Sequence, residues 1–260
     1  DVGLVYSPSW LPGFDATVDW WTYNIRNLIT GISNDQLLAD CYQYSILSAC
    51  NQFKRNPTTG QIYDLLNLET NAGWLKERGY DFSFNYRFPE TPVGNFKLGM
   101  NGTYIAAFNM LPTIGSNIVY MAGNTQNYYT SWRLRNNLTL NWSWRDFGAS
   151  WTVRYFSPYK VDCAFAPSTG ITAFPCTLPN YYAPDIGVVP QTQIASITFN
   201  DLQVYWNAPW HATISLGAND IFNRVSPNVY GGYQSGDTPY DYNSSYDLGR
   251  FVYMRYSQKF

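Results

Sequence analysis

Four cysteines are the most reactive side chains of this sequence. They form two close pairs, Cys41 with Cys50 and Cys163 with Cys176, each in a long polar stretch. An even number of cysteines at short spacing within loops is typical of disulfides formed in an oxidising compartment. A metal site is the competing interpretation, but neither spacing matches Cys-x-x-Cys and the single histidine, His211, lies elsewhere. We therefore predict two local disulfides.

The sequence offers little for catalysis or for metal binding. His211 is the one residue suited to general-base chemistry, but it lies beside a turn and no Ser and Asp partners can be assembled around it. We predict no enzyme, no catalytic residue, no cofactor and no metal, and we expect His211 to be a polar residue at the rim of the fold. Asp201 and Asp220 are isolated in the sequence. A calcium site stays open as an alternative in the last loop, which holds Asp237, Asp241 and Asp247.

Tyrosines at the tips of the long loops are the candidates for ligand binding. A tyrosine ring combines a rigid stacking surface with a hydroxyl group, which suits sugars, aromatic chelates or peptides. For any one of these rings the simpler interpretation also stays open, namely that it packs loops together or joins an aromatic belt. The predicted ligand-binding residues are Tyr128, Tyr129, Tyr181, Tyr182, Tyr230 and Tyr233.

The C-terminal segment indicates which kind of element carries these loops. Successive side chains of a strand point to opposite faces, and this segment alternates from Arg250 onward, so it has one face for lipid and one for a wet lumen. The apolar face holds Val252, Met254, Tyr256 and Phe260, and the polar face holds Tyr253, Arg255, Ser257 and Lys259.

Eight further segments alternate in the same way, and Gly79–Phe88 has the clearest period of two. Short turns and long loops alternate between the segments, as they do between the periplasmic and external ends of outer-membrane barrels. The long loops are therefore expected to be extracellular and the C-terminus periplasmic. The predicted strands are Asp1–Tyr6, Phe14–Leu28, Gly79–Phe88, Phe96–Ala107, Thr130–Trp144, Ala149–Tyr155, Ile194–Trp206, Trp210–Asn219 and the closing strand within Ser244–Phe260.

The composition agrees with an all-β transmembrane barrel. Aromatic residues make up 18% and charged residues 13%, whereas about a quarter of a typical domain is charged. The formal charge of −2 gives no reason to expect a nucleic-acid partner. No apolar run approaches the roughly 18 residues of a spanning helix. A β-sandwich with aromatic corners is the alternative fold.

An odd number of strands predicts an incomplete barrel. Bacterial single-chain barrels have even strand numbers, and unpaired backbone groups in hydrocarbon cost several kcal/mol each. Residues 1–260 are therefore expected to be the C-terminal portion of a larger barrel, with the remaining strands before Asp1 or on another chain.

Several motifs, in order along the chain, resemble those of TonB-dependent outer-membrane receptors. Residues 217–223 read Gly-Ala-Asn-Asp-Ile-Phe-Asn and are similar to the family's Gly-x-Asn-Asn-Leu-Phe-Asp element. Residues 246–253 read Tyr-Asp-Leu-Gly-Arg-Phe-Val-Tyr and resemble its entry to the closing strand, Tyr-Asp-x-x-Gly-Arg-x-Tyr. Upstream, Val18-Asp19-Trp20-Trp21 and the stretch from Cys41 to Ile62 resemble a strand and loop of large members. The chain departs from the pattern at Asp220 and Asn223, where the family more often has Asn and Asp.

This resemblance implies a barrel of about 22 strands with an N-terminal plug domain, here lying outside the chain. It implies active uptake of a scarce solute (a siderophore, saccharide or peptide) across the outer membrane of a Gram-negative bacterium. The implied partners are outer-membrane lipid, the plug and the rest of the barrel, the TonB complex, and the barrel-assembly machinery, for which Tyr256 and Phe260 form the C-terminal signal. The alternatives are a self-contained porin or autotransporter-type barrel and, from a different class, a secreted lectin-like β-protein.

Overall fold

The computed structural model describes residues 1–31, 34–66, 68–112, 117–126, 129–160, 182–183, 187–188, 193–225 and 249–259. The chain divides into two compact units. The first contains residues 1–21, 79–106 and 122–260, and the second contains residues 22–78 and 107–121. Within the described ranges, no helix has the length and apolar character required to cross a membrane.

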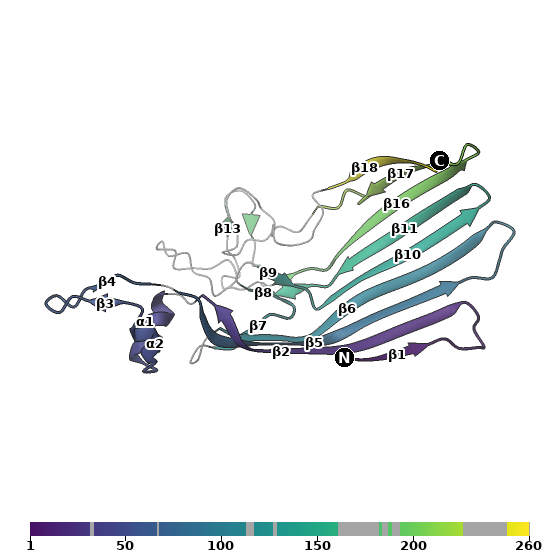
Figure 1. Cartoon of the computed structure of the whole chain (residues 1–260). Coiled ribbons are helices and arrows are strands. Elements are labelled where there is room, and N and C mark those ends of the chain that lie inside the picture. Colours follow the sequence, from purple (N-terminus) through teal and green to yellow (C-terminus); the bar gives the residue numbers. More distant parts are fainter. Residues whose placement is uncertain are drawn as a thin grey trace. The chain divides into compact units, whose positions relative to one another are not determined.

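One antiparallel sheet contains all the long strands (Figure 1). Its order is β1-β2-β5-β6-β10-β11-β16-β17-β18, and the short strand β7 (Val119–Tyr120) pairs with β6. Each long strand follows its neighbour in the sequence, so the predicted all-β antiparallel fold is confirmed. The bounds are β1 Val2–Tyr6, β2 Phe14–Thr30, β5 Thr70–Arg87, β6 Asn95–Leu111, β10 Leu134–Trp144, β11 Phe147–Phe156, β16 Ile197–Ala208, β17 Ala212–Asn219 and β18 Phe251–Gln258.

Three strand starts differ from the prediction by three residues or more. Strand β5 begins at Thr70 and not at Gly79, because backbone pairing continues where the side chains no longer alternate in polarity. The segment predicted as one strand from Thr130 is divided into β9 (Tyr129–Ser131) and β10, and β9 pairs with β8 (Asn124–Gln126). The segment predicted from Ile194 is likewise divided into β15 (Gln193–Ile194) and β16.

The strand register sorts the side chains into an apolar and a polar face. On the apolar face, Leu140 lies between Leu98 of β6 and Trp151 of β11. Farther along the sheet, Leu216 pairs with Met254, and these side chains are 54% and 67% exposed. An exposed apolar face of this extent is unusual for a protein surface in water. It is the arrangement expected of a strand face that contacts lipid.

The polar face is equally continuous across the strands. Asn137 lies between Asn101 of β6 and Arg154 of β11, and Thr139 faces Thr152 with a hydroxyl–hydroxyl distance of 3.0 Å. These residues alternate with the apolar ones, as the sequence predicted. One face of the sheet is therefore apolar, and the opposite face carries side chains that form hydrogen bonds.

Glycines on the polar face make room for tyrosine rings from the neighbouring strand. Gly217 pairs with Tyr253, and a Cβ atom at Gly217 would overlap the Tyr253 ring. The Tyr253 hydroxyl donates a hydrogen bond to Gln203 Oε1 at 3.1 Å. Gly148 is paired in the same way with Tyr205. Each ring covers the backbone that the glycine leaves open.

The short connections are tight turns. Ala208 pairs with Ala212 across a three-residue turn, whose last residue, His211, has φ of 61°. A left-handed residue at this position is typical of three-residue hairpin loops. His211 is exposed and its carbonyl accepts a hydrogen bond from the Lys259 amide at 3.1 Å. His211 thus lies in the turn itself.

The second unit contains a small folded insertion where the sequence indicated only a long loop, Thr30–Ala72. It consists of α1 (Asn34–Tyr42), α2 (Leu47–Cys50) and a hairpin of β3 (Lys54–Arg55) and β4 (Ile62–Tyr63). Leu37, Ala49 and Phe53 form its buried core. The predicted disulfide between Cys41 and Cys50 is present, with the Cα atoms 4.8 Å apart. The hairpin pairs only with itself, so it leaves the order of the main sheet unchanged.

Three further short strands lie in the first unit. They are β12 (Tyr159–Lys160), β13 (Tyr182–Ala183) and β14 (Gly187–Val188). Strand β12 pairs with β8 and β15 in a small sheet, and β13 pairs with β14.

Candidate functional site

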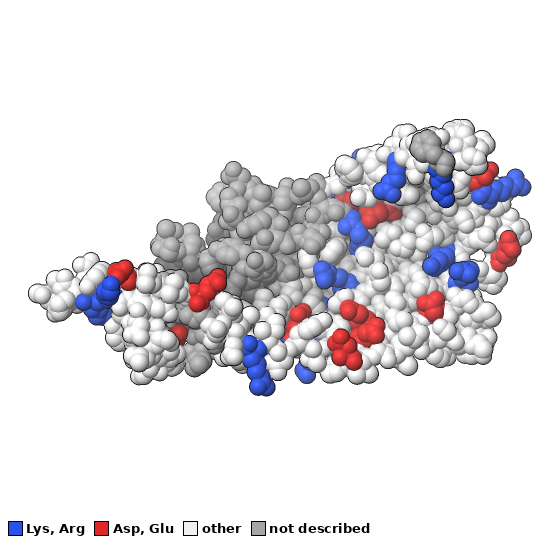
Figure 2. Space-filling view, in the orientation of Figure 1, with Lys and Arg blue, Asp and Glu red and all other residues white. Residues whose placement is uncertain are grey.

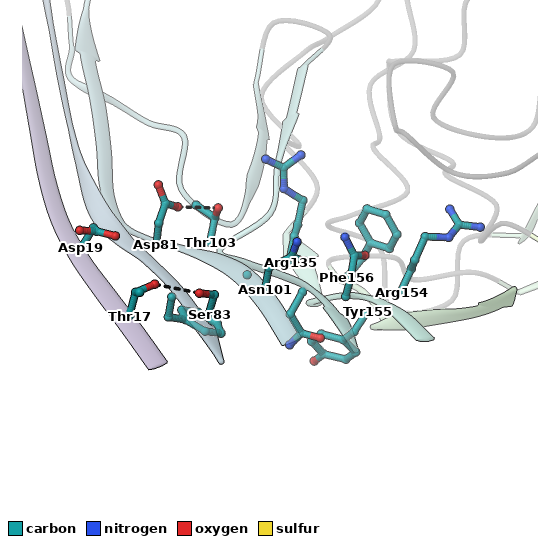
Figure 3. A pocket seen from close by; sticks show the side chains of 14 residues that line it. Thr17, Asp19, Asp81, Ser83, Asn101, Thr103, Arg135, Arg154, Tyr155 and Phe156 are labelled. Carbon is teal, nitrogen blue, oxygen red and sulfur yellow. Dashed lines mark hydrogen bonds between the residues drawn. The ribbon is translucent and has the colours of Figure 1, made fainter. Parts of the chain in front are cut away.

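A hollow of about 610 Å³ lies on the polar face of the first unit (Figure 3). Strands β2, β5, β6, β10 and β11 each contribute side chains to it, because the polar positions of neighbouring strands are in register. The lining includes Thr17, Asp19, Asp81, Ser83, Asn101, Thr103, Arg135, Asn137, Arg154 and Phe156.

One side of this hollow is acidic. Asp81 accepts a hydrogen bond from the Thr103 hydroxyl at 2.7 Å, and the hydroxyls of Thr17 and Ser83 are 2.8 Å apart. Figure 3 shows Asp19 and Asp81 on the same side, on neighbouring strands. The carboxylates on this side can accept hydrogen bonds and can pair with a cationic group.

The other side is basic and carries Arg135 and Arg154 (Figure 3). Arg154 is held by Asp201, with Nε to Oδ2 at 2.7 Å and Nη2 to Oδ1 at 3.0 Å. Arg135 stacks near the Trp132 ring at 6.0 Å and forms no ion pair within the described part of the chain. Arg135 is therefore one cation of the first hollow that a bound group can meet. Figure 2 shows charged side chains of both signs on the strands, with neither sign forming one continuous patch.

A second hollow of about 380 Å³ continues the polar surface along the same strands. It shares Ser83, Asn101 and Asn137 with the first hollow and adds Asn85 and Asn141. Amide and hydroxyl groups both donate and accept hydrogen bonds. The two hollows together form a strip lined by side chains that can donate and accept hydrogen bonds.

An aromatic cluster borders the basic side. Phe199 is 0% exposed and packs edge to face against Phe156 at 6.1 Å, and its ring also lies 5.2 Å below the guanidinium of Arg154. The cluster fixes the strand end that carries Arg154. Its members are Trp132, Phe156, Tyr159, Ile194, Ile197 and Phe199.

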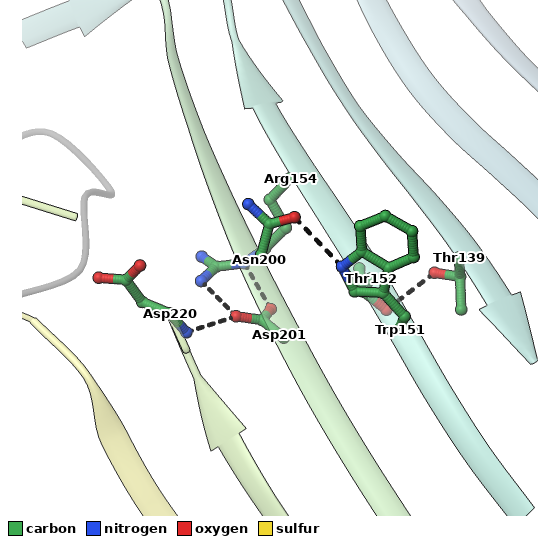
Figure 4. Close-up of polar contacts among 7 residues, drawn as sticks. All are labelled: Thr139, Trp151, Thr152, Arg154, Asn200, Asp201 and Asp220. Carbon is green, nitrogen blue, oxygen red and sulfur yellow. Dashed lines mark hydrogen bonds and ion pairs between the residues drawn. The ribbon is translucent and has the colours of Figure 1, made fainter. Parts of the chain in front are cut away.

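Asp201 connects three strands of the polar face (Figure 4). Besides the two bonds from Arg154 on β11, its Oδ1 accepts the Asp220 amide at 2.8 Å, at the end of β17. The side chains of Arg154 and Asp201 are 21% and 22% exposed. A largely buried, bidentate pair positions both charges and leaves a costly unpaired charge when one partner is removed.

Replacement of Asp201 by alanine is expected to lower the free energy of unfolding by about 3 kcal/mol. The matched control is Asp64→Ala, which removes an exposed ion pair of the described residues, Lys54–Asp64 at 2.5 Å. There the side-chain hydrogen bond and the charge of Asp64 raise the pKa of Lys54, but both side chains are exposed. Urea unfolding should separate the variants, with little change for Asp64→Ala. Equal losses would contradict the role of Asp201.

Of the residues that the sequence predicted for ligand binding and barrel assembly, Tyr256 has a described side chain, and it does not line these hollows. Tyr256 is exposed, accepts a hydrogen bond from Trp210 Nε1 at 3.3 Å and donates one to Gln258 Oε1 at 2.9 Å. The backbones of Tyr129 and Tyr182 lie in β9 and β13. Outside the described residues lie Tyr128, Tyr181, Tyr230, Tyr233, Cys163, Cys176 and Phe260.

No cluster of three or more metal-ligating His, Cys, Asp or Glu side chains occurs among the described residues. The lining side chains that sequence reasoning missed, such as Asp81 and Asn137, occupy alternate strand positions. Their polarity was visible in the sequence, but which of them meet is decided by the register of distant strands. The site is therefore a broad polar wall.

No family model and no curated protein matches the sequence. The structure is similar to a mutant of the ferric enterobactin receptor PfeA from Pseudomonas aeruginosa, with a TM-score of 0.57 and 15% identity over 99% of this chain. It is also similar to the FrpB iron transporter from Neisseria meningitidis (TM-score 0.53, 14% identity, 98% of this chain) and to the copper transporter OprC (0.51, 13%, 99%).

The chain spans about 30% of the length of each of these proteins. The chain thus has the fold of a β-barrel segment of the TonB-dependent receptors.

Proposed function

We propose that this chain forms part of the barrel wall of an outer-membrane active transporter, which binds a scarce solute outside the cell and imports it with energy delivered through TonB. The observation that carries the proposal is the two-faced sheet. Its apolar face is exposed where a soluble protein would have a core, and its polar face is hollowed and lined with hydrogen-bonding groups. A membrane barrel requires this division.

The sheet edges support a larger barrel. Strands β1 and β18 each pair on one side only among the described residues. In hydrocarbon every backbone group needs a partner, so both edges must be covered by further strands. We propose that residues 1–260 are the C-terminal portion of that barrel, with the long loops extracellular and the C-terminus periplasmic.

The polar wall is suited to a plug domain within the barrel. Its acidic side holds Asp19 and Asp81 and its basic side holds Arg135, so a folded domain with charges of both signs could be oriented on it. The mixed amide and hydroxyl strip between the two sides hydrogen-bonds to polar surfaces without demanding one charge. Contact with TonB would be made by the plug.

The solute class is proposed from the similar structures, whose names specify iron, ferric enterobactin and copper. A metal chelate such as a ferric siderophore is accordingly the first solute to test, before saccharides and peptides. The loop tyrosines Tyr128, Tyr129, Tyr181, Tyr182, Tyr230 and Tyr233 stay predictions for its external binding site.

Uptake measurements in the native bacterium test the proposal. Deletion of the gene is expected to abolish accumulation of a radiolabelled ferric siderophore under iron limitation, and deletion of TonB should have the same effect. Complementation by the intact gene is the control. Uptake that depends on the gene but persists without TonB would indicate a porin. Recovery of the protein in the soluble fraction without detergent would indicate a secreted β-protein.

A further inference from the structure

Strand β5 changes its character along the apolar face of the sheet. Alternate side chains of a strand share a face. Read from the C-terminal end of β5, this face holds in order Phe82, Tyr80, Arg78, Lys76 and Trp74. Arg78 and Lys76 are exposed, and Lys76 Nζ lies 4.7 Å from the centre of the Trp74 ring. The face that begins apolar therefore becomes basic along the same strand.

Strand β2 changes in the same way. Val18 and Trp20 share one face of this strand. The next three alternate positions are polar or basic, and all three residues are exposed: Thr22, Asn24 and Arg26. The sequences of both strands thus replace apolar side chains by polar and basic ones on the face that is apolar elsewhere.

A hydrogen bond aligns the two altered segments. The Thr22 hydroxyl donates to the Glu77 carbonyl at 3.3 Å, and β2 and β5 are neighbours in the sheet. Residues 22–26 of β2 therefore lie beside residues 74–78 of β5, and both segments belong to the second unit. Their cations form one surface, which we call the basic patch and which consists of Arg26, Lys76 and Arg78.

The basic patch has an uncompensated positive charge. Within the described part of the chain, no ion pair joins its three side chains to Asp or Glu. The nearest acidic residue of β5, Glu77, alternates with Lys76 and Arg78 and so belongs to the opposite face of the strand. Exposed charges of one sign attract groups of the opposite charge. The patch is therefore suited to an anionic partner.

The distance along β5 indicates at which level of a membrane the patch lies. Arg78 is nine residues before Arg87, the last residue of β5. A strand needs about 9–11 residues to cross a bilayer. Tyr80 and Trp20, each two positions before the polar segment of its strand, are 41% and 39% exposed, as suits the aromatic girdle of a barrel. In the orientation proposed above, the patch then lies at the level of the outer lipid headgroups.

We propose that the basic patch binds the phosphate groups of a phosphorylated lipid in the outer leaflet of the membrane. Guanidinium and ammonium groups form strong charge-assisted hydrogen bonds with phosphate oxygens, and basic residues beside a membrane surface bind anionic headgroups. The side chains of Thr22 and Asn24 supply further hydrogen-bond donors. The inference rests on the membrane location proposed above, but not on transport or on the solute.

The test is titration of the full-length protein in detergent with diphosphorylated lipid A, followed by microscale thermophoresis. The wild type is expected to bind saturably. The double variant Lys76→Gln/Arg78→Gln should bind about 30-fold more weakly, since each basic residue near a lipid surface contributes about 1 kcal/mol. The charge-conserving variant Lys76→Arg/Arg78→Lys should bind like the wild type, which would show that the loss follows the charge and not the folding.

The matched control removes two charges from the polar face of the sheet. Arg87 and Lys97 are both exposed, and Lys97 lines the second hollow. Arg87→Gln/Lys97→Gln should bind lipid A as tightly as the wild type does. An equal loss in this control would mean that only the total charge of the protein matters and would overturn the proposal.

The chemistry of the probe separates the remaining outcomes. Removal of the phosphates from lipid A should weaken its binding to the wild type, and inorganic phosphate at millimolar concentration should not displace the lipid. Equal binding of the dephosphorylated lipid, or displacement by inorganic phosphate, would overturn the lipid-phosphate site. Either result from a protein that inserts into membranes refutes this inference alone, whereas a protein that is soluble without detergent refutes the proposed location.

Discussion

Replacement of Phe199 by alanine is expected to lower the free energy of unfolding by about 3–5 kcal/mol. Phe199 is 0% exposed and contacts both Phe156 and the guanidinium of Arg154. Its removal leaves a cavity in the aromatic cluster and takes away the ring on which Arg154 rests. Both losses affect the end of β11 that carries Arg154 and Phe156. We therefore expect that the surrounding side chains do not fill the cavity.

Urea unfolding in detergent, followed by tryptophan fluorescence, measures this loss. The matched control is Phe222→Ala, since Phe222 is 73% exposed. A surface substitution of this kind usually changes stability by less than about 0.5 kcal/mol. If both variants unfolded at the same urea concentration, the aromatic cluster would not be a core of the first unit.

Replacement of Leu140 by arginine is expected to destabilise the membrane-inserted protein by about 2–4 kcal/mol. Leu140 lies on the apolar face, between Leu98 and Trp151. If that face contacts hydrocarbon, the guanidinium must lose its hydration or pull water into the bilayer. The measurement is reversible unfolding in lipid vesicles.

The neighbouring residue provides the control, because Thr139→Arg places the same side chain on the polar face. Thr139 lies opposite Gly99 and Thr152. The expected loss is that of a cross-strand hydroxyl contact, about 0.2–1 kcal/mol. A larger loss for Thr139→Arg than for Leu140→Arg would reverse the two faces and contradict the membrane orientation.

The long strands and their order were predictable from the sequence because alternation is a local signal. The alternating positions of Val252, Met254 and Tyr256 identify the apolar face of β18 without information from elsewhere in the chain. The start of β5 at Thr70 was not predictable in this way. Between Thr70 and Gly79 pairing is maintained by the backbone, and the side chains carry no period of two.

The helical insertion was missed because its short helices have no sustained apolar period. Leu37 and Ala49 become buried only when α1, α2 and Phe53 come together. The spacing of Cys41 and Cys50 did predict the disulfide that holds α1 to α2, and the structure contains it. The disulfide could therefore be predicted from the local cysteine spacing, whereas the packing of the helices around it could not.

The polar wall could be predicted as a face but not as a site. Asp81 on β5 and Arg135 on β10 are far apart in the sequence, and only the register of β6 between them brings both to one hollow. The burial of Asp220 could not be predicted either, because burial is a property of the folded chain. The loop tyrosines stay predictions for the external binding site.

The fit of Tyr253 over Gly217 bears on how faithfully the closing strand is assembled. A shift of the β17–β18 register by two residues would keep every apolar side chain on the apolar face. The alternation of polar and apolar residues alone therefore does not prevent such a shift. The slip would, however, bring the ring against Ser215 or Asn219 and leave a notch at Gly217 unfilled. The fit between the Tyr253 ring and Gly217 thus favours the correct strand register, which the alternation of polar and apolar residues alone does not determine.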